Sequence, residues 1–238
     1  MRFHIITIFP EMFDSYLKES IIGRAIKNKL ISIKFYNPRD FIKGNKTSYR
    51  SVDDKPYGGG PGMVMRTKPV LKAVEKVLRQ CFRSGFPATQ RQSFAKILPK
   101  LFKVKIIIFS PSGKKFETAY AKKLVKQKYT DMILISGRYE GIDARVQKIL
   151  RAERISIGDY VLTGGELSAM VLIDSISRQI PGVLGKYESL EEERISTSEV
   201  YTRPEVLKYK GKNYKVPKVL LSGNHKLIEI WKNKNKKS

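Results

Sequence analysis

Residues 156–185 read SIGDYVLTGGELSAMVLIDSISRQIPGVLG and combine three features. A loop flanked by glycines is followed by a helical segment that is apolar on nearly every side, and Arg178 stands where that segment ends. Because glycine has no side chain, such a loop lets the backbone come close to a small ligand. The two common nucleotide-binding loops, G-x-G-x-x-G and G-x-x-x-x-G-K-[ST], are absent from the sequence. The stretch therefore predicts a small-molecule site of a different kind.

Outward from this stretch, short apolar runs typical of strands alternate with helical patterns. We predict strands at residues 3–9, 31–36, 105–109, 132–135 and 154–157, and helices at 11–28, 69–78, 116–128, 142–150 and 166–180. This alternation favours an α/β fold with a mostly parallel sheet covered by helices. Ligands of such sheets bind where strands end, and three loops qualify: 110–113, 136–141 and 158–165.

The charge of the chain indicates a polyanionic partner. Its 238 residues carry 47 Lys and Arg against 22 Asp and Glu, a formal net charge of +25. An excess of this size favours nucleic acid as the partner. A membrane surface is the second choice, but the sequence has neither a long apolar run nor a basic amphipathic anchor, so we expect no membrane partner.

Cysteine and histidine are too scarce for a metal site built from those two residue types. The single cysteine, Cys81, excludes an internal disulfide, and the two histidines, His4 and His225, are far apart in the sequence. The N-terminal segment is too short and too regular for a signal peptide and reads as a strand. We therefore expect a cytoplasmic protein.

Four further motifs, together with residues 156–185, resemble one family in both content and order. They are DDKPYGGGPGM at residues 53–63, SGRYEGID at 136–143, YTRPEV at 201–206 and LLSGNH at 220–225. The chain is similar to the TrmD family of bacterial tRNA (guanine-37 N1)-methyltransferases. The resemblance implies an α/β SPOUT fold with a deep trefoil knot, S-adenosylmethionine as methyl donor, tRNA as substrate and a homodimer with active sites between subunits.

The resemblance also implies a division of the chain. Residues 1–180 would form the SPOUT cofactor-binding catalytic domain, with a basic insertion at 79–103. Residues 181–203 would link it to a short, small helical C-terminal tRNA-binding domain at 204–238. The helix at 166–180 is apolar on so many sides that it needs more than one covering surface, and sheet packing plus a dimer interface would supply them.

Methylation of guanine N1 sets two chemical requirements. The N1 proton must leave, and negative charge then develops on O6, so a base and a cation are needed. The resemblance assigns the O6 contact to Arg178; taken alone, an arginine there would equally suit the negative end of the helix dipole. The base falls on Glu193 where the family usually has aspartate, with Glu192 as the alternative, although an acidic run of this kind is commonly a solvated turn.

The remaining site residues are also implied by the resemblance. Glu140 would lie near the methionyl end of the cofactor, and with Glu193 it could support one Mg²⁺ with several waters. The cofactor would be bound by Phe109, Ser110, Pro111, Gly137, Tyr139, Ile157, Gly158, Asp159, Tyr160, Val161, Leu162, Gly164 and Gly165. The tRNA would be contacted by Asp54, Tyr57, Gly59, Gly60, Arg203, Asn224 and His225.

Two other functions are compatible with the basic charge. One is a catalytically silent RNA-binding SPOUT relative, which would have no need of Arg178, Glu193 or the loop at 158–165. The other is a SPOUT methyltransferase that acts on ribosomal RNA. The motifs at 53–63 and 201–206 favour the tRNA enzyme over it.

Overall fold

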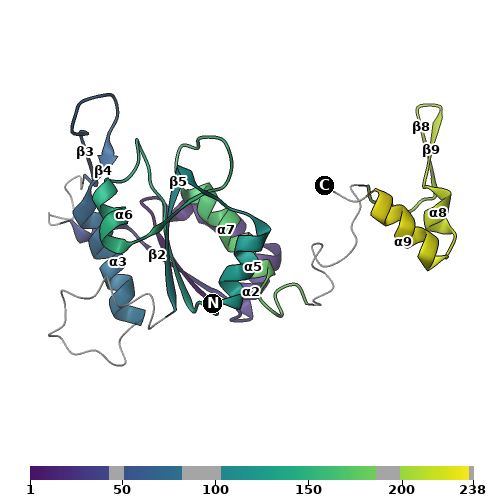
Figure 1. Ribbon diagram of the computed structural model, residues 1–238, viewed down its shortest axis with the longest axis horizontal. Coiled ribbons are helices and arrows are strands. Elements are labelled where there is room, and N and C mark those ends of the chain that lie inside the picture. The colour runs from purple at the N-terminus through teal and green to yellow at the C-terminus, as the bar shows by residue number, and fades with distance from the viewer. Residues whose placement is uncertain (43–50, 82–102, 186–198, 236–238) are drawn as a thin grey trace. The chain divides into compact units, whose positions relative to one another are not determined.

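The computed structural model describes residues 1–42, 51–81, 103–185 and 199–235 (Figure 1). The chain divides into two compact units, Met1–Val183 and Leu184–Ser238. Residues 82–102 of the predicted basic insertion and 186–198 of the predicted linker lie outside the described part. The domain boundaries proposed from the sequence stay a prediction.

The first unit is built on a five-stranded sheet with the strand order β2-β1-β6-β5-β7. Its strands are β1 (Arg2–Ile6), β2 (Ser32–Tyr36), β5 (Val104–Lys115), β6 (Asp131–Ile135) and β7 (Glu153–Ser156). All neighbouring strands in it run parallel. The predicted α/β class with a mostly parallel sheet is therefore confirmed, while the trefoil knot stays a prediction.

Helices cover both faces of this sheet (Figure 1). One face carries α3 (Thr67–Cys81) and α6 (Ala144–Leu150), and the other carries α2 (Ser20–Lys27), α5 (Thr118–Lys126) and α7 (Glu166–Arg178). The short elements η1 (Pro10–Phe13), α1 (Asp14–Leu17) and η2 (Pro38–Phe41) complete the helical set of this unit.

Two hydrophobic cores follow from this layering. Successive side chains of a strand point to opposite faces of a sheet. On β6, Met132 and Leu134 join the core under α2, α5 and α7, whereas Ile133 and Ile135 join the core under α3 and α6. All five residues of β6 are buried, which is why residues 132–135 of this central strand read as an unbroken apolar run in the sequence.

Two predicted elements differ from the structure. The helix predicted at 11–28 is split, because the chain turns after the C-cap Lys18 and Ser20 takes a φ of +49°. The turn predicted at Ser110–Gly113 is instead part of β5, whose pairing with β7 shifts register between Phe109 and Lys114. Gly113 allows that shift, since a Cβ there would lie 2.6 Å from the backbone nitrogen of Ile155.

A small antiparallel pair, β3 (Asp53–Asp54) and β4 (Val64–Met65), closes the base of the glycine-rich loop. The loop lies between them and contains Gly58, Gly59, Gly60 and Gly62 at φ values of +87°, +78°, +107° and +83°. These are left-handed conformations that favour glycine. The run of glycines therefore specifies the path of the loop.

The second unit contains helices, as predicted, and also a hairpin. Its elements are β8 (Val206–Tyr209), β9 (Lys212–Lys215), α8 (Lys218–Leu221) and α9 (His225–Lys234). The hairpin was missed because all its residues are exposed, so it has no buried face to impose an apolar alternation. Across the described helices of both units, none is long and apolar enough to cross a bilayer.

Candidate functional site

A cavity of about 370 Å³ lies where β5, β6 and β7 lead into their following segments. Its volume falls in the range of small-molecule sites. Of the thirteen residues predicted to bind a cofactor, those that line it are Phe109, Ser110, Pro111, Gly137, Tyr139, Ile157, Tyr160, Val161, Leu162, Gly164 and Gly165. The tertiary structure thus brings the three predicted loops to one place, at the edge of the sheet where ligands of parallel sheets bind.

Two predicted cofactor residues, Gly158 and Asp159, are absent from that lining. Gly158 lies beneath the ring of Tyr160, where a Cβ would come 2.7 Å from the Tyr160 Cζ atom. The Tyr160 hydroxyl donates a 3.4 Å hydrogen bond to the carbonyl of Ile157. A side chain at this position would therefore require the exposed Tyr160 ring to move.

The glycine pair at 164–165 joins two of the loops. The Gly165 amide donates to the Gly137 carbonyl at 2.9 Å, and Gly164 forms an isolated bridge with Arg138. A Cβ on Gly165 would lie 2.7 Å from the Cα atom of Ser136. Glycine therefore allows the loop at 158–165 to approach the loop at 136–141 closely, and the two loops together form one wall of the cavity.

Arg138, which the sequence analysis did not single out, connects these loops through a buried ion pair. Its Nε lies 2.9 Å from Glu166 Oε2, and Glu166 is only 1% exposed. The other Glu166 oxygen accepts a 2.8 Å hydrogen bond from the Thr7 hydroxyl. Arg138 also donates to the Thr163 carbonyl at 3.4 Å, and its guanidinium lies 4.8 Å from the centre of the Phe9 ring.

This network ties the segment after β6, the start of α7 and the segment after β1 into one structure. A buried carboxylate is tolerated only when it is paired and hydrogen-bonded, and Arg138 and Thr7 meet that requirement for Glu166. The motif SGRYEG gave no signal for this role of Arg138, because its partner Glu166 is distant in the sequence. We regard Arg138 as a positioning residue for the cavity.

Glu140 is exposed at the rim of the cavity, next to the glycine-rich loop. Its amide donates to the Met63 carbonyl at 2.9 Å, and the Met65 amide donates to the Gly141 carbonyl at the same distance. Gly62 lies beside the Glu140 side chain, and its φ of +83° is a conformation that favours glycine. The structure thereby places the base of the loop predicted to contact tRNA against the predicted cofactor loop.

Among the loop residues predicted to contact tRNA, Asp54, Tyr57, Gly59 and Gly60 are all exposed, and Tyr57 is fully exposed. Three others lie in the second unit. Arg203 and His225 are exposed there, and the Asn224 side chain accepts a 3.2 Å hydrogen bond from the Leu227 amide at the start of α9. Asn224 is therefore an N-cap of that helix. Their contact with tRNA stays a prediction.

Arg178 is the last residue of α7 and is half-buried, but it does not line the cavity. It acts electrostatically on Tyr16, whose hydroxyl donates to Asp174, four residues before Arg178 on the same helix. Burial and the Asp174 hydrogen bond raise the pKa of Tyr16 to about 12, and the charge of Arg178 opposes that rise. Within one chain, the predicted catalytic arginine and the cavity are thus separate features.

Glu193 and Glu192, the two candidates for the base, lie outside the described residues. The proposed pairing of Glu193 with Glu140 at a magnesium ion is therefore untested. Of the side chains that the structure describes, Glu140 belongs to no group of three potential metal ligands.

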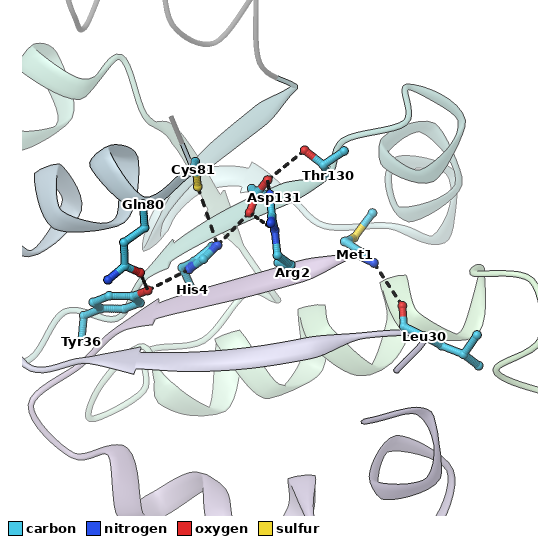
Figure 2. Close-up of polar contacts among 9 residues, drawn as sticks. All are labelled: Met1, Arg2, His4, Leu30, Tyr36, Gln80, Cys81, Thr130 and Asp131. Carbon is cyan, nitrogen blue, oxygen red and sulfur yellow. Dashed lines mark hydrogen bonds and ion pairs between the residues drawn. The ribbon is translucent and has the colours of Figure 1, made fainter. Parts of the chain in front are cut away.

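Among the described residues, one group of three potential metal ligands does occur: His4 in β1, Cys81 at the end of α3 and Asp131 at the start of β6 (Figure 2). The scarcity of cysteine and histidine argued against a metal site built from those two residue types, and it gave no indication that an aspartate would join one of each. His4 Nε2 donates to Asp131 Oδ1 at 2.8 Å, and the Cys81 sulfur lies 4.0 Å from that nitrogen. On its other side, the His4 ring lies 3.2 Å from the Tyr36 hydroxyl.

The group is better described as a buried hydrogen-bond network than as a metal centre. Arg2 donates to both oxygens of Asp131 at 2.7 Å, and the Thr130 hydroxyl donates to Oδ2 at 2.8 Å, so the carboxylate is already saturated (Figure 2). Burial, with Asp131 nearby, raises the pKa of the Cys81 thiol to about 12. A neutral thiol is a poor metal ligand.

The fold and cavity define an α/β protein with a cavity of small-molecule size at the carboxyl edge of a parallel sheet. A family model described as tRNA (Guanine-1)-methyltransferase TrmD matches residues 1–238. The chain belongs to this family.

Similar proteins carry the name tRNA (guanine-N(1)-)-methyltransferase. One from Buchnera aphidicola subsp. Acyrthosiphon pisum is 44% identical over 234 residues, which cover 97% of this chain and 87% of the relative. One from Clostridioides difficile is 42% identical over 236 residues, covering 98% and 90%. One from Dehalococcoides mccartyi (strain CBDB1) is 43% identical over 238 residues, covering 98% and 85%.

Proposed function

We propose that this protein transfers a methyl group from S-adenosylmethionine to N1 of guanine 37 in tRNA. The observation that carries the proposal is the gathering of three sequence-distant loops around one cavity, in a chain matched over its whole length by a guanine-N1 methyltransferase family. The net charge of +25 supports a tRNA substrate, because phosphate contacts dominate nucleic-acid affinity.

The cavity suits the proposed methyl donor. Ile157 and Leu162 offer apolar surface, and the loops at 137–141 and 160–165 offer backbone donors and acceptors. When bound, S-adenosylmethionine supplies an electrophilic methyl group on a sulfonium. The protein would hold that group in line with N1, and positioning of this kind accounts for a large share of the catalysis in a group transfer.

The remaining chemistry is assigned to two side chains. Arg178 would face O6 and stabilise the negative charge that develops there, and Glu193 would accept the N1 proton. Glu193→Gln should lower turnover at least about a hundredfold while leaving the affinity for S-adenosylmethionine within about twofold. If Glu192→Gln has this effect and Glu193→Gln does not, Glu192 is the base.

We also propose a homodimer. Leu167 and Val171 on α7 are 50% and 44% exposed, and Met12 and Tyr16 beside that helix are 43% and 42% exposed. Contiguous exposed apolar surface of this kind marks an interaction site. Because Arg178 shares the exposed side of α7 and does not line the cavity of its own chain, a second copy on this face would account for both observations.

The magnesium proposal is supported by the position of Glu140 at the cavity rim. One carboxylate and several waters are a common arrangement for this ion, with the second carboxylate expected from Glu193. Activity should then fall on treatment with EDTA and return on addition of Mg²⁺.

A methylation assay with tRNA transcripts tests the proposed function. Methylation at N1 blocks reverse transcription, so a transcript with G at position 37 should give a stop there, and an A37 transcript should give none. Binding of tRNA without methylation would favour a silent RNA-binding relative. Methylation of ribosomal RNA in place of tRNA would favour the other alternative.

A further inference from the structure

The second unit presents a β-hairpin that is exposed throughout. Strands β8 and β9 pair in the register Val206–Lys215, Leu207–Tyr214, Lys208–Asn213 and Tyr209–Lys212. Lys210 and Gly211 connect them, both with positive φ, at +48° and +76°. Two such residues form the tight turn that suits a twisted hairpin. Figure 1 shows the hairpin extending away from α8 and α9.

The two faces of this hairpin differ in chemistry. Directly paired residues share a face, and so do residues two apart on one strand. One face, here called the tyrosine face, consists of Leu207, Tyr209, Lys212 and Tyr214. The opposite face consists of Val206, Lys208, Asn213 and Lys215. On the tyrosine face, Leu207, Tyr209 and Tyr214 are 54%, 57% and 55% exposed.

The charge of the hairpin indicates what would cover the tyrosine face. Residues 206–215 contain four lysines and no acidic residue. The Lys210 ammonium lies 5.4 Å from the centre of the Tyr209 ring, so a cation accompanies the aromatic surface. A partner must therefore offer flat apolar surface together with negative charge.

Unpaired nucleotides meet both requirements. Bases stack on aromatic side chains, each for about 1–3 kcal/mol, while lysines neutralise the adjoining phosphates. A base within a duplex has both of its faces covered by its neighbours, so a duplex offers phosphates without a surface for stacking. The aromatic rings therefore discriminate in favour of unpaired RNA.

We propose that the tyrosine face of the β8–β9 hairpin binds unpaired nucleotides of the RNA substrate by stacking on Tyr209 and Tyr214. The inference rests on the proposed function in taking that RNA to be tRNA. It adds a contact in the second unit through which the enzyme recognises single-stranded regions of its substrate.

The test compares three RNAs with the full-length protein at one salt concentration. The double variant Tyr209→Leu/Tyr214→Leu keeps apolar side chains but removes both rings. It should weaken binding of a tRNA transcript and of a single-stranded oligonucleotide by about tenfold or more, and binding of an RNA duplex by less than about twofold. In the methylation assay, KM for tRNA should rise while kcat changes little.

Control variants lie on the opposite face. Val206→Thr should leave all three affinities unchanged, and Lys215→Gln should weaken single-stranded and duplex RNA equally, because it removes only a charge. Circular dichroism of the double variant should match the unaltered protein, since none of its hairpin positions is buried.

Three results would overturn the proposal. The first is an unchanged affinity of the double variant for single-stranded RNA. The second is an equal loss of its affinity for duplex RNA. The third is that the double variant loses binding to anionic phosphatidylserine vesicles but keeps binding to RNA. The proposed function fails separately: the unaltered protein would then give no stop at G37, while the double variant would still lose single-stranded RNA binding.

Discussion

Arg138 shows how one side chain can join several segments that surround a cavity. Its ion pair with Glu166 is buried, its other two nitrogens donate to the Thr163 carbonyl and the Met12 sulfur, and its guanidinium lies over the Phe9 ring. A guanidinium can serve several partners in one plane, whereas an ammonium is a compact point charge. The shape of the cavity wall should therefore depend on arginine at this position in particular.

Arg138→Lys should retain the charge opposite Glu166 but lose the contact with Thr163. We expect the dissociation constant for S-adenosylmethionine to rise about tenfold, which corresponds to about 1.4 kcal/mol, with little change in melting temperature. Arg138→Leu should lower both affinity and stability, because it leaves the Glu166 charge buried without a partner. Calorimetry and thermal unfolding distinguish the two effects, and wild-type affinity in Arg138→Lys would refute the positioning role.

Asp131, at the start of β6, is the centre of a buried hydrogen-bond network. Burial raises the pKa of its carboxyl, but hydrogen bonds from His4, Arg2 and Thr130 outweigh burial and hold the pKa well below its usual range. A group with a depressed folded-state pKa stabilises the protein above its unfolded pKa, about 3.9 for aspartate. That contribution is lost as the pH falls through the folded-state value.

Asp131→Asn should therefore lower the free energy of unfolding by on the order of 3 kcal/mol at pH 7. The difference from the unaltered protein should stay constant down to about pH 5 and shrink below about pH 4. Urea unfolding at several pH values measures it. A difference that persists undiminished at pH 2.5 would show that the charge of Asp131 is not responsible.

Among the elements, the loop after β7 depends on glycine for contact between backbones. Gly165 has an ordinary φ of −84°, so replacing it causes no conformational strain of its own. Gly165→Ala should nevertheless destabilise the protein by about 1–3 kcal/mol, because the new methyl group meets the Ser136 backbone at 2.7 Å. Urea unfolding is the appropriate measurement.

Gly137→Ala is the matched control. The nearest atoms to its added Cβ belong to the Ile142 side chain, at 3.0 and 3.2 Å, and a side chain can move aside more easily than backbone. Its destabilisation should be clearly smaller than that of Gly165→Ala. Equal values for the two variants would contradict the backbone-contact explanation.

The elements that the sequence predicted well are those with a strong apolar pattern. The strands at 132–135 and 154–157 and the helix at 166–180 match β6, β7 and α7 to within two residues at each end. The elements that the sequence did not predict lack such a pattern. Some depend on contacts between distant residues, and the hairpin has no buried face at all. Ser110–Gly113 stays in β5 because β7 pairs on both sides of it, and the exposed hairpin has no apolar face to give it a signal.

For the whole molecule, the exposed side of α7 bears on assembly. Leu167→Glu/Val171→Glu places two charges on the proposed interface and should convert a dimer into a monomer in light scattering coupled to size-exclusion chromatography. Ile149→Glu is the control, because Ile149 is 46% exposed on α6, on the other face of the sheet. A monomeric unaltered protein would refute the homodimer.

The sequence by itself determined the α/β class, the preference for a polyanionic partner and the family. These depend on local patterns, on total charge, and on the content and order of short motifs. Only the tertiary structure decided that three loops form one cavity and that Arg138 joins them through Glu166 and Thr7. It also decided that Arg178 lies outside that cavity and that His4, Cys81 and Asp131 meet. These are relations between residues far apart in the chain, and they arise from the order in which parallel strands pair, which no local pattern encodes.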